Sequence, residues 1–93
     1  MASEIVHRTL TIVNEKGLHA RASAKLVEVV EGFDATAEVS RDGLSASGDS
    51  IMGLLMLAAS RGSTIELRTS GPDAQALADA VEALVANRFG EEM

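Results

Sequence analysis

The hydrophobic residues of this chain change their spacing several times within 93 residues, and this constrains the fold more than any other feature of the sequence. Segments in which every second residue is apolar alternate with segments in which apolar residues recur every three to four positions. A period of two is typical of a strand with one buried face, and a period near 3.6 is typical of a helix with one buried stripe. The pattern therefore predicts short strands interleaved with helices around one core.

Four strands are predicted where apolar residues alternate with Thr, Ser or Glu, and the alternating polar face should meet water. We expect the second and third strands to form a hairpin, because Arg41-Asp42-Gly43 between them has the composition of a tight turn. The predicted strands lie around residues 9–12, 35–40, 44–47 and 64–68.

Three helices are predicted by spacing and by signals at their ends. The first runs from Ala20 to Glu31 and is followed by Gly32, a common stop. The second covers residues 51–57 and follows Asp49 and Ser50, both of which are good N-cap residues. The last helix continues to about residue 85, with Pro72 expected in its first turn.

The elements thus alternate in the order strand, helix, strand, strand, helix, strand, helix. Every strand has one apolar face and every helix has one apolar stripe, so the economical arrangement covers one face of an antiparallel sheet with helices. We predict an α+β fold with a four-stranded antiparallel sheet and three helices on one face. The length suits a single domain over residues 1–93.

The composition disfavours several classes of function. A net charge of -6 disfavours nucleic acid as a partner, because phosphate backbones are held by clustered basic residues. The absence of cysteine removes disulfides, thiolate metal ligands and thiol catalysis. The longest apolar stretch, residues 51–59, is far shorter than the ~20 residues of a spanning helix, and residues 1–4 do not resemble a secretion signal. We expect a cytoplasmic protein without membrane insertion.

The segment Gly17-Leu18-His19-Ala20-Arg21-Ala22 lies where a predicted loop gives way to a helix. The first N–H groups of a helix have no partner within it, so the backbone at Ala20 and Arg21 favours an anion. The Arg21 guanidinium can donate paired hydrogen bonds to phosphate oxygens, and a neutral nitrogen of His19 can act as a nucleophile. The segment therefore suits acceptance of a phosphoryl group by His19.

Other interpretations of these residues remain open from the residues alone. His19 could be a surface or capping residue at a helix start. A metal site made of His7 and His19 is disfavoured, because no cluster with ligand spacing accompanies either residue. A hydrolase pairing Ser50 or Ser23 with His19 is also disfavoured, since neither an orienting acid nor a nucleophile on a sharp turn is recognisable.

The segment from Gly17 to Ala22 resembles the active-site segment of HPr, the histidine phosphocarrier family of the bacterial phosphoenolpyruvate-dependent phosphotransferase system. A second segment, Ser50-Ile51-Met52-Gly53-Leu54, resembles the regulatory serine segment of many HPr proteins. The resemblance spans about residues 8–89 and implies an open-faced sandwich with the element order given above. Many HPr proteins carry a proline in the first turn of the helix after the histidine, where this chain has Arg21-Ala22-Ser23, and this departure leaves the branch of the family open.

The resemblance implies a role for each matching residue. His19 would take a phosphoryl group on Nδ1 from phosphorylated enzyme I and pass it to an enzyme IIA-type acceptor, while Arg21 and the backbone of Ala20 would stabilise that group. An HPr kinase/phosphorylase would act on Ser50, although a serine there also has a sufficient structural reason as an N-cap. The exposed apolar patch that docks partners would consist of Leu18, Ile51, Met52 and Leu55, for which core packing is the alternative interpretation.

The resemblance thus implies a monomeric carrier protein, not an enzyme, that needs no metal or cofactor. Two alternatives remain, namely a regulatory HPr-like binding module switched by phosphorylation of Ser50 and a carrier in a nitrogen-related branch of the system. The presence of His19 beside Arg21 argues against the first alternative, because a module that carries no phosphoryl group has no need of this pair.

Overall fold

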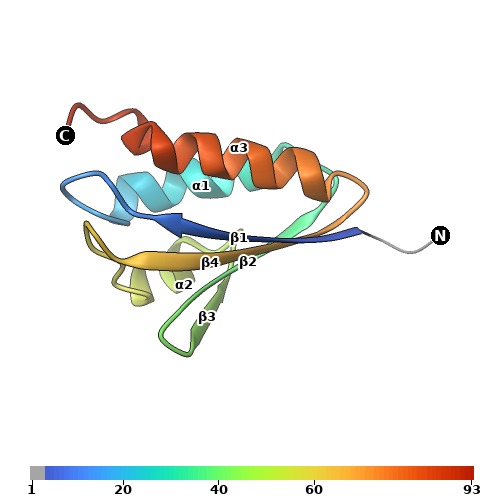
Figure 1. The fold of residues 1–93 in the computed structure, drawn as a ribbon, viewed down its shortest axis with the longest axis horizontal. Coiled ribbons are helices and arrows are strands. Elements are labelled where there is room, and N and C mark those ends of the chain that lie inside the picture. The colour runs from blue at the N-terminus through green and yellow to red at the C-terminus, as the bar shows by residue number, and fades with distance from the viewer. Residues whose placement is uncertain (1–3) are drawn as a thin grey trace.

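The computed structural model describes residues 4–93, so Met1, Ala2 and Ser3 lie outside the described range. Two expectations therefore lie partly outside the described residues. They are the single domain over residues 1–93 and the absence of a secretion signal in residues 1–4. Figure 1 shows the arrangement of the elements. In chain order these are β1 (Glu4–Thr11), α1 (Ala20–Glu31), β2 (Thr36–Arg41), β3 (Leu44–Ser47), α2 (Ile51–Met56), β4 (Thr64–Gly71), α3 (Ala74–Ala86) and the short 3-10 turn η1 (Arg88–Gly90).

The four strands form one sheet in the order β1-β4-β2-β3, in which every neighbouring pair is antiparallel. β2 and β3 form the predicted hairpin, with Arg41 opposite Leu44. Asp42 and Gly43 in the turn between them both have positive φ, which matches the twist of the two strands. The predicted four-stranded antiparallel sheet is therefore confirmed.

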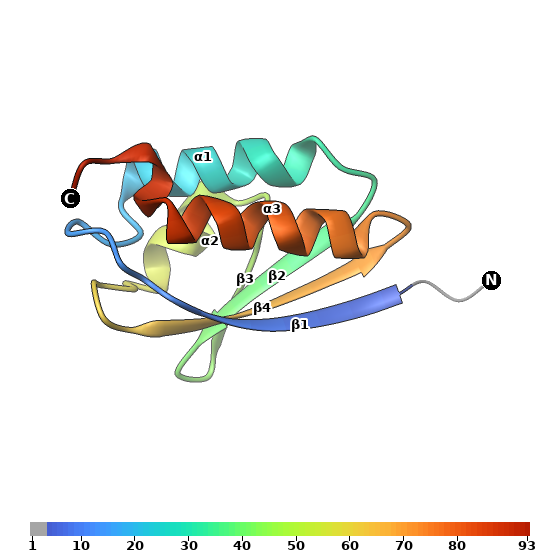
Figure 2. The same cartoon turned by 45° about the horizontal axis from the view of Figure 1, so that its top comes forward.

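The two long helices, α1 and α3, lie side by side over one face of the sheet (Figure 2). They run in opposite directions, so the start of α1 and the end of α3 lie at the same end of the molecule (Figures 1 and 2). The short helix α2 packs against α1 and β3. This arrangement is the predicted α+β fold, and it brings the loop before α1 close to the turn after α3.

One hydrophobic core lies between the sheet and the helices. Alternate residues of β2 and β4 are buried, as are single stripes of α1 and α3. The other face of the central strand β4 exposes Thr64, Glu66 and Arg68, as the alternation predicts. Large side chains that are wholly buried in the core include Ile12, Leu26, Leu54, Leu57, Ile65, Leu67, Leu77 and Phe89.

Several predicted element boundaries were wrong. β1 begins at Glu4, well before the predicted start near residue 9, and ends at Thr11. Pro72 does not lie in the first turn of α3, because Asp73 is the N-cap and the helix begins at Ala74. The Asp73 carboxylate accepts the backbone N–H of Asp34 at 2.8 Å, which ties the turn containing Pro72 to the segment before β2. β4 continues to Gly71, beyond the predicted end at residue 68, because it pairs with β1 along its whole length.

The loop between β1 and α1 is held by a close backbone contact at Gly17. This residue has a φ of +68°, and a Cβ atom added to it would lie 2.5 Å from the carbonyl oxygen of Ala59. The next residue, Leu18, donates its N–H to the same oxygen at 2.9 Å. Glycine is required at position 17 both for its backbone conformation and for this close approach.

We predict that Gly17→Ala destabilises the protein more than Gly43→Ala does. Gly43 also has a positive φ of +84°, but an added Cβ would have nothing within 4 Å. The control should lose about 1 kcal/mol from backbone strain alone, and Gly17→Ala should lose a further ~1–3 kcal/mol because a backbone segment has to move. Chemical denaturation of both variants measures the difference, and equal losses would contradict this account of the loop.

Candidate functional site

His19 is the N-cap residue of α1, with extended backbone angles. Its carbonyl oxygen accepts the N–H of Ser23 at 2.8 Å, while its side chain makes no capping hydrogen bond to the helix. The first N–H groups of α1 therefore have no side-chain cap, and they point out of the helix start beside the imidazole ring. The structure thus places His19 at the helix start, as the sequence predicts.

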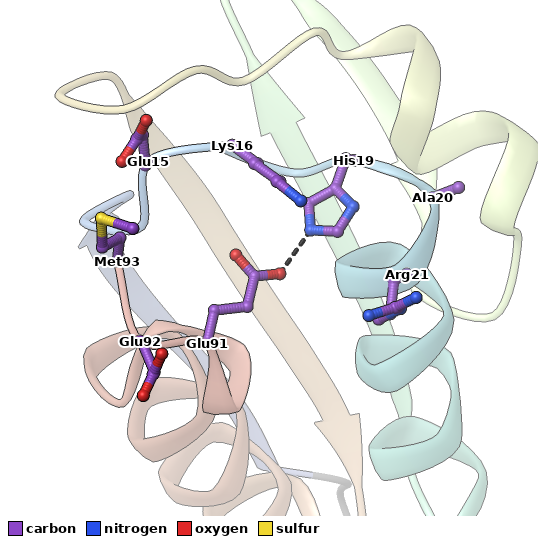
Figure 3. A pocket seen from close by; sticks show the side chains of 8 residues that line it. All are labelled: Glu15, Lys16, His19, Ala20, Arg21, Glu91, Glu92 and Met93. Atoms are coloured by element: carbon purple, nitrogen blue, oxygen red, sulfur yellow. Dashed lines mark hydrogen bonds and ion pairs between the residues drawn. The ribbon is translucent and has the colours of Figure 1, made fainter.

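An open pocket of about 640 Å³ surrounds the His19 side chain (Figure 3). Ala20 and Arg21, the first two residues of α1, contribute exposed groups to it. Lys16 adds a second positive charge from the loop and is not among the predicted site residues. The residues that line this pocket are Glu15, Lys16, His19, Ala20, Arg21, Glu91, Glu92 and Met93.

Glu91, which follows η1, contacts the His19 ring directly. One carboxylate oxygen, Oε2, pairs with Nε2 of His19, and the two side chains are partly buried (Figure 3). The other oxygen, Oε1, accepts the amide N–H of Asn14 at 3.0 Å. Sequence reasoning missed Glu91, because it lies 72 residues from His19 and outside any periodic segment.

Asn14 links the Glu91 carboxylate to the loop before α1. Its side chain is wholly buried, and Nδ2 also donates to the carbonyl oxygen of Gly17 at 2.8 Å. Exchanging the amide oxygen and nitrogen would place an acceptor against two acceptors, so the orientation of this amide is fixed. The Asn14 side chain therefore joins the loop and the C-terminal segment.

The turn η1 is fixed by the burial of its central residue. Phe89 has no exposed surface and a φ of +54°, and Arg88 and Gly90 also have positive φ. The carbonyl oxygen of Phe89 accepts the Nζ of Lys25 on α1 at 2.6 Å. The chain therefore makes a tight turn after α3 and is tied to α1, which brings Glu91 to the His19 ring.

The contacts of Glu91 favour its ionised form. The hydrogen bond to His19, then the one from Asn14, and the nearby positive charge of Lys16 hold the pKa of the Glu91 carboxyl below its ordinary value of 4.5. Partial burial acts in the opposite direction but is outweighed. Glu91 therefore carries a negative charge at neutral pH.

The side chains predicted to form an exposed apolar docking patch differ in their exposure. Leu18 is 4% exposed and belongs to the core, so its assignment to an exposed patch was wrong. Its N–H bond to Ala59 draws this part of the loop inward. On α2, Ile51 is 39% and Met52 70% exposed, while Leu55 is half-buried. Met56, 74% exposed, was missed by the sequence analysis.

The two serines considered in the sequence have different surroundings. Ser50 is the N-cap of α2, and its Oγ accepts the N–H of Gly53 at 3.1 Å, which confirms the predicted capping role. Ser23 is buried, and its hydroxyl donates to the carbonyl oxygen of Leu18 at 3.3 Å. The Ser23 side chain therefore points to the backbone of the loop before α1. A serine at this position fits the first turn of the helix.

The two histidines are not brought together. His7 is exposed in β1, on the face of the sheet away from the helices, and lies opposite Arg68 of β4. Among residues 4–93, no group of three His, Asp or Glu side chains is arranged to hold a metal ion. None of the helices in this part of the chain has the length and apolar character needed to cross a bilayer.

Comparisons with known proteins give a consistent result. The family described as "PTS HPr component phosphorylation site" matches residues 6–87. The phosphocarrier protein HPr of Cupriavidus necator is 52% identical over 94% of this chain and 98% of its own length. The phosphocarrier protein NPr of Shewanella violacea is 44% identical over 92% of this chain and 94% of its own.

Solved structures agree with these sequence matches. The crystal structure of HPr-C-His from Thermoanaerobacter tengcongensis superimposes with a TM-score of 0.90 and 33% sequence identity. The match covers 95% of this chain and 99% of that one. The fold described above is therefore shared over nearly the whole of both chains.

The lowered pKa of Glu91 predicts a stability difference between the parent and Glu91→Gln that depends on pH. The ionised carboxylate stabilises the folded state, so the advantage of the parent should be fully present above pH 4.5 and should shrink as the pH falls through the lower pKa of the folded protein. Denaturant unfolding of both proteins between about pH 2 and pH 6 measures this difference. Glu92→Gln is the control for net charge, because it removes the same charge from a residue that lacks this hydrogen bond. A stability difference between the parent and Glu91→Gln that grows on acidification would contradict the prediction.

Proposed function

The chain belongs to the HPr family of phosphocarrier proteins of the phosphotransferase system, and from this premise we propose that His19 is the residue that carries the phosphoryl group. The position of His19 at the uncapped start of α1, next to Arg21, is the observation that supports this assignment most strongly. Members of this family carry the group as a phosphohistidine and pass it on; they are not enzymes.

The surroundings of His19 suit a transferable phosphoryl group. The free N–H groups at Ala20 and Arg21 and the guanidinium of Arg21 supply hydrogen-bond donors for its oxygens. The pocket is open, so a partner can bring its own phosphoryl group to the ring. We propose that Arg21 stabilises both the transferring group and the phosphohistidine, with Lys16 adding positive charge nearby.

We propose that phosphorylated enzyme I donates the group and that an enzyme IIA-type protein accepts it, as family membership implies. The exposed side chains of Ile51, Met52 and Met56 on α2 form an apolar surface for such partners. Methionine is flexible and suits a surface that has to fit more than one partner. Leu55, which is half-buried, would contribute its outer part to this surface.

We also propose that Ser50 is a site of regulatory phosphorylation. It directly precedes the exposed residues Ile51 and Met52, so a phosphate there would add negative charge beside the docking surface. The capping bond to Gly53 is a sufficient structural role for this serine, and regulation would be added to it. A module that is only regulatory leaves the arrangement of His19 and Arg21 without a use.

The branch of the phosphotransferase system is set by partners that the site itself does not identify. Sequence identity does not separate a carbohydrate-linked from a nitrogen-related carrier, because an NPr at 44% lies between HPr proteins at 52% and 40%. Transfer from the phosphorylated chain to a panel of acceptors of both kinds distinguishes the two.

The proposed carrier role predicts that phosphoenolpyruvate and a matching enzyme I label this protein with one acid-labile, base-stable phosphoryl group. His19→Ala should abolish the labelling, because it removes the nucleophile. His7→Ala is the matched control, since His7 lies on the far face of the sheet, and it should be labelled like the parent. Labelling of His19→Ala at the level of the parent would overturn the assignment.

Arg21→Ala is predicted to slow phosphoryl transfer while leaving the fold intact. Loss of one preorganised donor to a group that develops charge in the transition state typically costs about 10²–10³-fold in rate, whereas a surface side chain contributes little to stability. Rapid-quench measurement of phosphorylation and circular dichroism check the two parts. Arg68→Ala, on the outer face of the sheet, controls for the lost charge. A normal rate would show that Arg21 has no role in transfer, and loss of the folded signal would show that its role is structural.

Ser50→Asp is predicted to weaken binding to phosphorylated enzyme I, because the added charge lies beside the proposed docking surface and repels the negatively charged phosphoryl group that the partner brings. Ser45→Asp places the same charge on an exposed position of β3 and serves as control. Isothermal titration of both variants gives the affinities. Equal affinities for the two would remove the basis for regulation at this site.

A further inference from the structure

We propose that Glu91 is a positioning residue that holds the His19 ring in its Nε2–H form and so presents the Nδ1 lone pair to the incoming phosphoryl group. The inference rests on the proposed role of His19 and adds a group that lies far from it in sequence. Glu91 acts through the ring and not on the phosphoryl group.

The contact between the two side chains determines which nitrogen carries the proton. An ionised carboxylate has oxygen acceptors and no donor, so Nε2 of His19 has to donate to Oε2 of Glu91. The lowered pKa of Glu91 keeps it ionised and therefore an acceptor at neutral pH. In the neutral ring the lone pair is then at Nδ1.

The Glu91 carboxylate is itself held from two sides. Asn14, wholly buried, donates to Oε1 and is oriented by its second bond to Gly17. Phe89, two residues before Glu91, is buried in the core, and its carbonyl oxygen is bound by Lys25. The carboxylate therefore has a fixed place, as orientation of a histidine requires.

The free nitrogen faces the side on which an anion would bind. In Figure 3, Nε2 is directed to Glu91, and the other ring nitrogen is turned toward Ala20 and the start of α1. Nδ1 has no hydrogen-bond partner among the described residues. A phosphoryl group attached there would lie next to the uncapped N–H groups of α1 and the side chain of Arg21.

The fixed tautomer makes the transfer step simple. When the donor is a phosphohistidine of the partner protein, the Nδ1 lone pair of His19 forms the new N–P bond, and the electron pair of the old N–P bond returns to the donor nitrogen. Because Nε2 already carries its proton, no proton has to leave the ring before the attack. The positive charge that the ring gains develops beside the Glu91 carboxylate, which stabilises it.

The test compares Glu91→Ala with Glu92→Ala, because Glu92 lines the same pocket but makes no hydrogen bond or ion pair within residues 4–93. In ¹⁵N-histidine-labelled protein, at a pH where the rings are neutral, ring nitrogen shifts report the tautomer of His19, and His7 is an internal reference. We expect Nε2–H in the parent and in Glu92→Ala. Glu91→Ala should populate both tautomers and accept the phosphoryl group about tenfold more slowly.

The outcomes separate this inference from the proposed function. If the parent is not phosphorylated at His19, the proposed function fails. If the parent is phosphorylated but Glu91→Ala keeps either the tautomer or the rate of the parent, only the role of Glu91 is overturned. If Glu91→Ala does not fold, Glu91→Gln decides the question with the same two readouts, because its amide can donate as well as accept and no longer requires Nε2–H.

Discussion

The burial of Leu18 is the interaction on which the arrangement of the site depends. Its side chain enters the core, and its N–H bonds to Ala59, so the chain is fixed one residue before the histidine. Gly17 makes this possible, because any larger residue would collide with the same carbonyl group. His19 then becomes the N-cap of α1 through its carbonyl oxygen alone, without a hydrogen bond from its side chain to the helix. The ring is placed by its neighbours and remains available for chemistry.

Much of the fold could be predicted from sequence, because each element carries its own periodic pattern and end signals. Ala20–Glu31 and the cap at Ser50 are examples in which local residues decide the structure. Leu18 was assigned to the surface because a motif gives the order of residues and not the direction of a side chain. Glu91 was missed for a different reason: its partners, Asn14 and His19, lie 77 and 72 residues away.

The site combines groups of opposite charge on the two sides of one ring. The start of α1, Arg21 and Lys16 supply positive potential where an anion would bind. Glu91 supplies a negative charge at the opposite nitrogen. A phosphoryl group that is bound and then released needs both the positive potential and the nearby negative charge, since a purely positive site would retain its anion. The geometry therefore suits a phosphoryl group that is first bound and then released.

The turn of the chain at Phe89 also has a consequence during synthesis of the protein. During synthesis, His19 and Arg21 emerge early, whereas Glu91 follows only after α3. The carboxylate reaches the ring once Phe89 has entered the core, which closes a loop of more than seventy residues. A nascent chain that ends before Glu91 therefore carries the His19 motif without the carboxylate that contacts its ring.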